Sequence, residues 1–188
     1  MIYLIRHGET EWSRCGRHTG LTDLPLTADG ERSARSVGTA LAGKQFSKVW
    51  TSPLQRAKHT CELAGFSAVT TVDQGLVEWD YGDYEGRMLP DIQAERPGWS
   101  LFRDGCPGGE SVAQVRSRAE SFLQRAGAEP DGILIFSSGH FLRMLTTVWL
   151  ECDPLFAERL VLGTGSLSLL EYDARHSVRA LRLWNHQP

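Results

Sequence analysis

The stretch Leu4-Ile5-Arg6-His7-Gly8-Glu9-Thr10 decides how this chain begins to fold. The apolar residues from Ile2 to Ile5 predict a buried strand, and this strand ends in an arginine, a histidine and a glycine. Open α/β sheets bind their ligands at the carboxyl ends of their strands. The sequence therefore predicts that His7, a potential nucleophile, lies at the ligand-binding edge of a sheet.

His7 and its neighbours have the chemistry that phosphoryl transfer needs. A neutral imidazole can attack phosphorus, and the guanidinium of Arg6 can hold phosphoryl oxygens in a bidentate fork. Gly8 would let the backbone approach a phosphate closely. Taken alone, the tripeptide is better explained as a strand-end turn with a solvated histidine, so the interpretation depends on the residues that follow.

The residues that follow extend the motif to Trp12, and matching segments occur from Gly16 to Asp23 and at Pro25-Leu26-Thr27. Together they closely resemble the histidine phosphatase superfamily, which includes the phosphoglycerate mutases. The resemblance covers nearly the whole chain. It implies that His7 is phosphorylated as a covalent intermediate, and it implies no metal or other cofactor.

Length and charge narrow the class of protein. At 188 residues the chain fits one domain, residues 1–188, with a substantial core. A net charge of −3 and an isoelectric point of about 6.1 predict no nucleic acid and no membrane partner. No apolar run spans a membrane, and no cleavable leader precedes the first strand. We expect a cytoplasmic protein whose partner is a small phosphorylated substrate, with a homodimer as one alternative.

The four cysteines are distant from one another and match no metal-binding spacing. They are Cys15, Cys61, Cys106 and Cys152. We expect reduced thiols, without a structural zinc site or a disulfide framework.

Helical and strand-like patterns alternate along the chain and predict an α/β sandwich with a mostly parallel sheet and a C-terminal antiparallel hairpin. The expected strands cover 2–5, 49–51, 69–72, 132–136, 166–172 and 178–184, and the expected helices cover 27–42, 111–126 and the residues after 52 and 139. Residues 8–26 are expected to be loop. The segment at about 82–110 is expected to be loop with short helical pieces over the active site. The resemblance implies the three-layer α/β/α fold of phosphoglycerate mutases.

Arg56 lies one turn after a predicted helix start, with Ser52 as N-cap and Pro53 as first helical residue. Its guanidinium and the positive end of this helix would point the same way. In isolation Arg56 would be a solvated surface arginine. The segment from Thr51 to Ala57 looks like the strand-to-helix motif of the superfamily, which implies that Arg56 binds the phosphoryl group. With Arg6, it would lower the pKa of His7.

Four acidic residues lie in the run from Leu76 to Gly86: Glu78, Asp80, Asp83 and Glu85. Spacing alone does not choose a general acid among them. The resemblance implies Glu78, and Asp80 or Glu85 is the alternative. Protonation of a leaving group needs a carboxylic acid whose pKa is raised by burial, for which Trp79 and Tyr81 could supply apolar walls.

The chain departs from the superfamily after the predicted strand 132–136. Members commonly end this strand in His-Gly and carry an arginine four residues after the glycine; here Ser138-Gly139-His140 is followed by Arg143, so Ser138 takes the histidine's position. Ser138 can donate a neutral hydrogen bond, which is weaker than one from an imidazolium. His140 either reaches the phosphate as a substitute donor or only caps the next helix.

Two further residues are interpreted as phosphate-binding. Ser13 stands where many mutases carry asparagine, and the hydroxyl or backbone of Thr19 could bind a phosphate oxygen. His18 either contacts the ligand or is a solvated loop residue.

Three functions fit these residues. The first is a metal-independent phosphomonoesterase for a small phosphorylated metabolite, such as a sugar phosphate or bisphosphate. Within the superfamily the chain most resembles the sedoheptulose bisphosphatase type, through Glu11-Trp12-Ser13, Thr19 to Asp23, Glu78 to Gly86, Arg103 to Cys106 and Gly109-Glu110.

The second function is phosphoryl transfer of the mutase type, which must exclude water from the phosphohistidine. Only about fifty residues separate Glu78 from Ile133, which leaves little material for a lid and favours hydrolysis. The third function is a weakly active phosphoryl-binding protein, because Ser138 replaces the usual second histidine.

Overall fold

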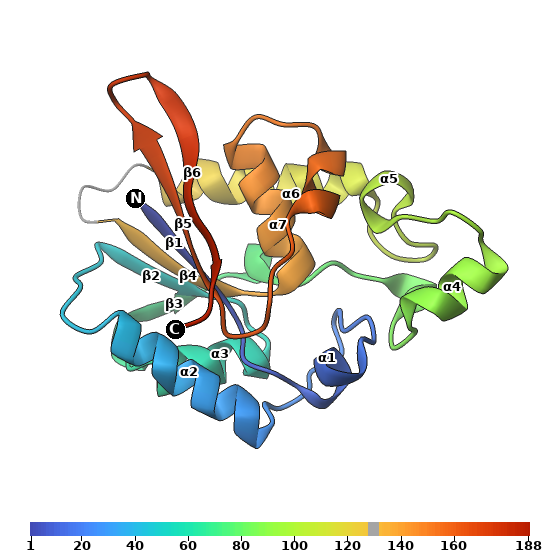
Figure 1. Cartoon of the computed structure of the whole chain (residues 1–188), viewed down its shortest axis with the longest axis horizontal. Coiled ribbons are helices and arrows are strands. Elements are labelled where there is room, and N and C mark those ends of the chain that lie inside the picture. Colours follow the sequence, from blue (N-terminus) through green and yellow to red (C-terminus); the bar gives the residue numbers. More distant parts are fainter. Residues whose placement is uncertain (128–131) are drawn as a thin grey trace.

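A mixed β-sheet lies at the centre of the molecule (Figure 1). Within residues 1–127 and 132–188, which this computed structural model describes, six strands pair in the order β3-β2-β4-β1-β5-β6. Their bounds are β1 Ile2–Arg6, β2 Lys48–Thr51, β3 Thr70–Val72, β4 Ile133–Ser137, β5 Leu167–Asp173 and β6 Val178–His186. The first four in that order are parallel, whereas β5 and β6 pair antiparallel. The predicted mostly parallel sheet with a C-terminal hairpin is confirmed.

Helices cover both faces of this sheet, which gives the predicted three layers (Figure 1). Helices α2 (Ala28–Ala40) and α3 (Gln55–Leu63) pack against one face, and α6 (Val112–Ala126) and α7 (Gly139–Trp149) against the other. Thr27 caps α2 by accepting the amide hydrogen of Gly30 at 3.1 Å. Ser111 caps α6 through a reciprocal bond with Gln114.

The central strand β4 shows how the core is divided. All five of its residues are buried. Ile133 and Ile135 pack with α6 and α7, whereas Leu134 and Phe136 pack with α2 and α3. Because side chains alternate across a strand, a continuous apolar run is what a strand covered on both faces requires.

Short helices occupy the connections. They are α1 (Glu11–Cys15), α4 (Leu89–Glu95) and α5 (Leu101–Asp104), together with short 3₁₀ helices at Ser67–Val69, Gln74–Leu76, Gly82–Tyr84 and Pro154–Arg159. The prediction of short helical pieces between 82 and 110 is confirmed. The prediction that residues 8–26 are entirely loop is wrong, because Thr10 and Ser13 form a capping box that starts α1.

The predicted start of α3 is also wrong. The helix begins at Gln55, not at Ser52-Pro53. The carboxylate of Asp23, more than thirty residues earlier in the chain, accepts the amide hydrogen of Gln55 at 2.7 Å. Asp23 therefore caps the N-terminus of α3, although it is distant in sequence. Arg56 is the second residue of this helix.

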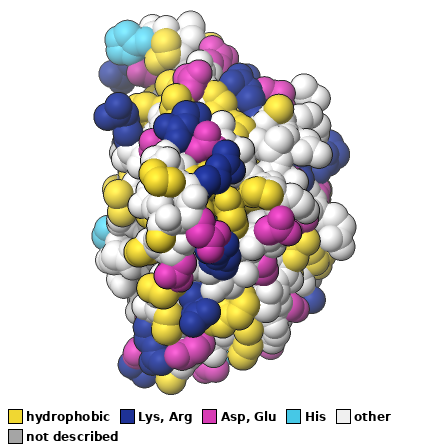
Figure 2. Space-filling view, turned by 90° about the vertical axis from the view of Figure 1, so that its right-hand side faces the viewer, with side chains coloured by type: hydrophobic (Ala, Val, Ile, Leu, Met, Phe, Trp, Pro, Cys, Tyr) yellow, Lys and Arg dark blue, Asp and Glu magenta, His cyan; other side chains and the backbone are white. Residues whose placement is uncertain are grey.

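The surface shows no region dominated by one sign of charge on the side drawn in Figure 2, where basic, acidic and hydrophobic side chains are interspersed. Within the described part of the chain no helix is long and apolar enough to cross a membrane. The four cysteines all carry free thiols.

Candidate active site

A pocket of about 270 Å³ opens where β1 and β4 end. It is lined by Arg6, His7, Ser13, Gly16, Arg17, His18, Thr19, Glu78, Tyr81, Leu89, Gly139, His140, Arg143 and Leu162. Six of the eight residues that the sequence selected are among them. Arg56 and Ser138 are not, because both are fully buried behind the pocket wall.

His7 is held by its own backbone and by the strand beside it. Its backbone N–H donates to Ser137 O at 3.0 Å, and its Nδ1 lies 2.7 Å from Gly8 O. A carbonyl oxygen can only accept, so Nδ1 carries the hydrogen and Nε2 keeps a free lone pair. Burial first, and then Arg56 and Arg6, lower the pKa of His7 well below its usual value. His7 is therefore a neutral imidazole at pH 7.

Gly8 is required by a close contact. Its amide hydrogen bonds to Thr60 Oγ1 at 3.0 Å. A Cβ atom at Gly8 would lie 2.3 Å from Gly30 O, at the start of α2. The sequence suggested that Gly8 allows a phosphate to approach; in the structure, the absence of its side chain allows α2 to approach.

Arg6 and Arg56 are bonded to carbonyl groups. Arg6 Nη1 donates to Leu162 O, and Arg56 donates to the carbonyl oxygens of Thr22 at 2.8 Å, Gly20 at 2.7 Å and Thr19 at 3.0 Å. Among the described residues, neither Nε has a partner.

Neither arginine forms an ion pair within the described part of the chain. Burial lowers the pKa of both guanidinium groups, but an arginine stays charged in proteins. Two buried cations without a bound carboxylate create a positive potential that favours an anion beside His7.

Glu78 is buried, with 4% of its surface exposed, and lies at the beginning of α7. Its Oε2 accepts the amide hydrogen of His140 at 2.9 Å, and its Oε1 accepts those of Phe141 at 2.8 Å and Trp79 at 2.9 Å. Donors at a helix N-terminus suit a carboxylate.

The other acids of this run have local roles. Asp80 accepts from Gly82 N, and Glu85 accepts from the amides of Gly20 and Thr22. Of the four acids in the run from Leu76 to Gly86, all of which the structure describes, Glu78 is the one that lines the pocket.

His140 faces the pocket and does not cap its helix with its side chain. Its Nδ1 lies 2.5 Å from the hydroxyl oxygen of Tyr81. Burial, followed by the charges of Arg143 and His18, lowers the pKa of His140 well below its usual value, and burial raises the pKa of Tyr81. At pH 7 this pair is a neutral imidazole and a protonated phenol, so His140 offers at most an uncharged hydrogen bond.

Ser138 is the N-cap residue of α7, but its side chain makes no cap bond. Its Oγ is buried and has no partner among the described residues. Ser138 therefore supplies no cation at the position where the superfamily commonly carries histidine, and neither does the neutral His140.

Ser13 and Thr19 line the pocket with hydroxyl groups that are engaged locally. Ser13 Oγ donates to Thr10 O at 3.0 Å and accepts from Thr10 N at 2.9 Å, and Thr19 Oγ1 donates to Arg17 O at 3.1 Å. His18 Nδ1 lies 2.9 Å from Arg87 O, and its ring stacks on that of His140 with centroids 6.0 Å apart.

Arg143 is a pocket residue that was not among the candidates from the sequence. It follows His140 by three residues on α7, so the two side chains share a helix face, and this spacing is the signal that could have found it. Its Nε donates to Ala157 O at 2.8 Å, and its guanidinium carbon lies 4.7 Å from the ring centroid of Phe102.

A second pocket of about 270 Å³ shares His18, Leu89, His140 and Arg143 with the first. It continues toward Trp99, Ser100, Phe102 and Glu158. The site is thus an elongated cavity with His7 and Arg6 in one pocket and an aromatic wall in the other. No group of three His, Cys, Asp or Glu side chains in the described chain could hold a metal ion.

Comparison with known proteins decides the family. The profile of the histidine phosphatase superfamily, branch 1, matches residues 2–187. The chain belongs to the histidine phosphatase superfamily. The predicted enzyme class, a histidine phosphatase, is confirmed at this level.

Individual relatives support this assignment. The chain is 39% identical over 184 residues to an acid phosphatase of Mycobacterium tuberculosis, covering 96% of this chain and 89% of the relative. It is 34% identical over 179 residues to the sedoheptulose 1,7-bisphosphatase of Saccharomyces cerevisiae, covering 78% and 66%. A solved structure for an open reading frame of Mycobacterium tuberculosis superimposes with a TM-score of 0.93 at 37% identity, covering 99% of this chain and 97% of that one.

Proposed function

We propose that the protein is a metal-independent phosphomonoesterase that transfers the phosphoryl group of a small phosphorylated metabolite first to His7 and then to water. The observation that carries this proposal is the state of His7: a buried, neutral imidazole with a free Nε2, beside two arginines without carboxylate partners. Positioning and positive charge are the main requirements of phosphoryl transfer.

In the first step, which requires Glu78 to be protonated in the complex with substrate, His7 Nε2 attacks phosphorus, the bond from phosphorus to the leaving oxygen breaks, and Glu78 gives its proton to that oxygen. In the second step, the Glu78 carboxylate takes a proton from the attacking water. The bond from phosphorus to nitrogen then breaks, phosphate leaves, and His7 is again neutral. Arg6 and Arg56 stabilise the charge on the phosphoryl oxygens in both steps.

The shape of the cavity supports a substrate that extends beyond its phosphoryl group. The second pocket would receive the remainder of the metabolite, beside the ring of Trp99 and the guanidinium of Arg143 that packs on Phe102. A sugar phosphate or bisphosphate has the polar hydroxyl or anionic groups that such a pocket can bind. The similarity to the yeast bisphosphatase supports the same class, but it is weaker than the similarity to the mycobacterial acid phosphatase, so the bisphosphatase type that the sequence suggested stays a proposal. We favour hydrolysis over mutase transfer because the segment between Glu78 and α6 contains only short helices within the described residues, which is little material for a lid that excludes water.

Trapping of the covalent intermediate tests this function. Mixing the enzyme with a ³²P-labelled substrate and stopping it in alkali should leave a label that is stable to alkali, labile to acid and located in the peptide that contains His7. The His7→Ala variant is the blank. A label on serine or cysteine, or none on histidine with a substrate that is turned over, would contradict the mechanism.

Restoring a histidine at position 138 should increase activity. The Ser138→His variant would place an imidazole at the end of β4, where the negative charge of a bound phosphate would favour the protonated ring and so a charge-assisted hydrogen bond. Such a bond contributes about 1.5 to 3 kcal/mol, so kcat should rise roughly tenfold to a hundredfold. The measurement is steady-state hydrolysis of p-nitrophenyl phosphate by the two purified proteins.

The matched control is Ser138→Ala, which should change kcat less than about threefold because Ser138 Oγ has no partner. If Ser138→His is less active than the parent and His140→Ala is severely impaired, then His140 already supplies the missing interaction.

The same missing cation favours a second candidate function, a phosphoryl-binding protein with weak turnover. Titration calorimetry with inorganic phosphate, together with the turnover of p-nitrophenyl phosphate, separates the two. Tight phosphate binding with negligible turnover would support the second function.

A further inference from the structure

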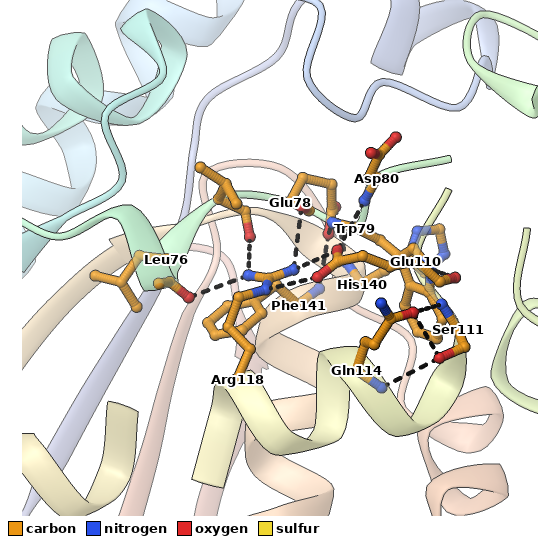
Figure 3. Close-up of polar contacts among 12 residues, drawn as sticks. Leu76, Glu78, Trp79, Asp80, Glu110, Ser111, Gln114, Arg118, His140 and Phe141 are labelled. Carbon is orange, nitrogen blue, oxygen red and sulfur yellow. Dashed lines mark hydrogen bonds and ion pairs between the residues drawn. The ribbon is translucent and has the colours of Figure 1, made fainter. Parts of the chain in front are cut away.

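An ion pair lies behind Glu78, outside the pocket. Arg118, on α6, meets Glu110, just before α6, through two parallel bonds: Nη2 to Oε2 at 2.8 Å and Nε to Oε1 at 2.9 Å (Figure 3). The two side chains are 16% and 21% exposed. A bidentate pair of this kind has a fixed geometry. Both side chains also form hydrogen bonds with the backbone of the segment that carries Glu78.

Arg118 binds the backbone before and at Glu78. Its Nη1 donates to Val77 O at 2.7 Å and Gly75 O at 3.0 Å, and its Nη2 lies 3.3 Å from Glu78 O. The guanidinium carbon is 4.5 Å from the ring centroid of Phe141. Phe141 is the residue whose amide hydrogen bonds to Glu78 Oε1, so one guanidinium contacts both the residue that carries the carboxyl group and a residue that orients it.

Glu110 binds the backbone after Glu78. Its Oε2 accepts the amide hydrogen of Asp80 at 3.0 Å, and its own backbone accepts from Trp79 Nε1 at 2.8 Å and donates to Asp80 O at 2.9 Å (Figure 3). Residues 77–81 form neither helix nor strand, so no regular ladder of hydrogen bonds fixes them. Instead, Arg118 binds the backbone before Glu78 and Glu110 binds the backbone after it, and together they fix the segment.

We infer that Arg118 and Glu110 are positioning residues for Glu78, which hold segment 75–80 so that the carboxyl group faces the leaving oxygen. This inference rests on the proposed role of Glu78 as the general acid. A displacement of about 1 Å is enough to impair catalysis by a positioned group. Lysine cannot substitute, because a single ammonium cannot hold Glu110 in a fork and also reach three carbonyl groups.

The test compares two leaving groups. Arg118→Met should lower kcat about tenfold or more for an alkyl phosphate such as glycerol phosphate. This loss is smaller than the full contribution of a general acid, because the Glu78 carboxyl group is still present but less well positioned. The KM should stay within about threefold, and kcat for p-nitrophenyl phosphate should fall less than about threefold, because nitrophenolate leaves with little protonation.

The matched control is Arg116→Met. Arg116 lies on the same helix, pairs with Glu120 at 2.9 Å and is 40% exposed. Exposed ion pairs contribute little to stability. Loss of the Arg116 side chain should therefore change kcat by less than about twofold for both the alkyl phosphate and p-nitrophenyl phosphate. A general effect of removing an arginine from α6 would appear in both variants.

A double variant separates this inference from the proposed function. If Arg118 acts through Glu78, adding Arg118→Met to Glu78→Gln should cost less than about twofold more on the alkyl phosphate. Equal losses of Arg118→Met on both substrates, or no loss, would overturn the positioning role even where Glu78→Gln remains selective. A non-selective loss in Glu78→Gln itself would instead overturn the role of Glu78.

Should Arg118→Met not fold, Glu110→Gln provides the second variant. It keeps the size of the side chain and one acceptor oxygen but loses the charge. It should show the same selectivity for the alkyl phosphate with a smaller loss, and an equal loss on both substrates would again overturn the inference.

Discussion

His7→Ala is expected to lower kcat at least about 10⁴-fold on every phosphomonoester, because loss of the nucleophile stops a covalent mechanism at its first step. The other two histidines that line the pocket, His18 and His140, lie in the loop after α1 and on α7, not at the end of β1 beside Arg6. The alanine leaves β1 and its backbone bonds to Ser137 and Gly165 intact, so the protein should fold normally. Turnover of p-nitrophenyl phosphate, with thermal unfolding as a check on folding, measures the loss.

His176→Ala is the matched control for this variant. His176 is exposed in the turn between β5 and β6 and pairs with Asp173, so its loss should change turnover less than about twofold. Activity of His7→Ala within tenfold of the parent would mean that another group, or water directly, attacks phosphorus.

Glu78→Gln has the second largest expected effect, and the effect depends on the leaving group. Alkyl phosphates should lose about a hundredfold or more in kcat, because an amide cannot protonate an alkoxide. p-Nitrophenyl phosphate should lose much less, since its leaving group needs little protonation. Oε1 of the glutamine can still accept from Trp79 and Phe141, whereas its amide nitrogen cannot replace Oε2 as the acceptor for His140 N.

Asp80→Asn is the comparison for Glu78→Gln. Asp80 stands two residues later but does not line the pocket, and its carboxylate accepts from Gly82. It should show no preference between the two substrates. Equal losses on both substrates in Glu78→Gln would remove the general acid from this position, and a selective loss in Asp80→Asn would move the assignment there.

Much of the fold could be predicted because it depends on local patterns. The apolar run of β4 and the glycine after it predict a buried strand followed by α7, and both are present. The start of α3 could not be predicted, because its cap is Asp23, which is distant in sequence. Helix α1 was missed because it has only five residues and no buried face.

The site divides in the same way. The place of His7 and Arg6 at the pocket was predictable because they end a strand, whereas their proposed chemistry and the choice of Glu78 depend on the resemblance of the motifs to the superfamily. Arg118 was not predictable: an arginine on an amphipathic helix is usually solvated, and its partners lie about forty residues away at Gly75, Val77 and Glu78. The sequence does not decide whether Ser138 or His140 replaces the usual second histidine at the phosphate. In the structure, the Ser138 hydroxyl has no partner among the described residues and burial lowers the pKa of His140, so neither side chain carries a charge at pH 7.

The contact between Gly8 and Gly30 has an evolutionary consequence. A Cβ on Gly30 would lie 2.2 Å from Glu9 O, as one on Gly8 would lie 2.3 Å from Gly30 O. The loop after His7 and the first turn of α2 are thus in mutual contact through residues without side chains. Any side chain at Gly30 would displace the loop that follows His7, so we expect mutational drift at this helix position to be restricted although it lies outside the pocket and has no chemical function of its own.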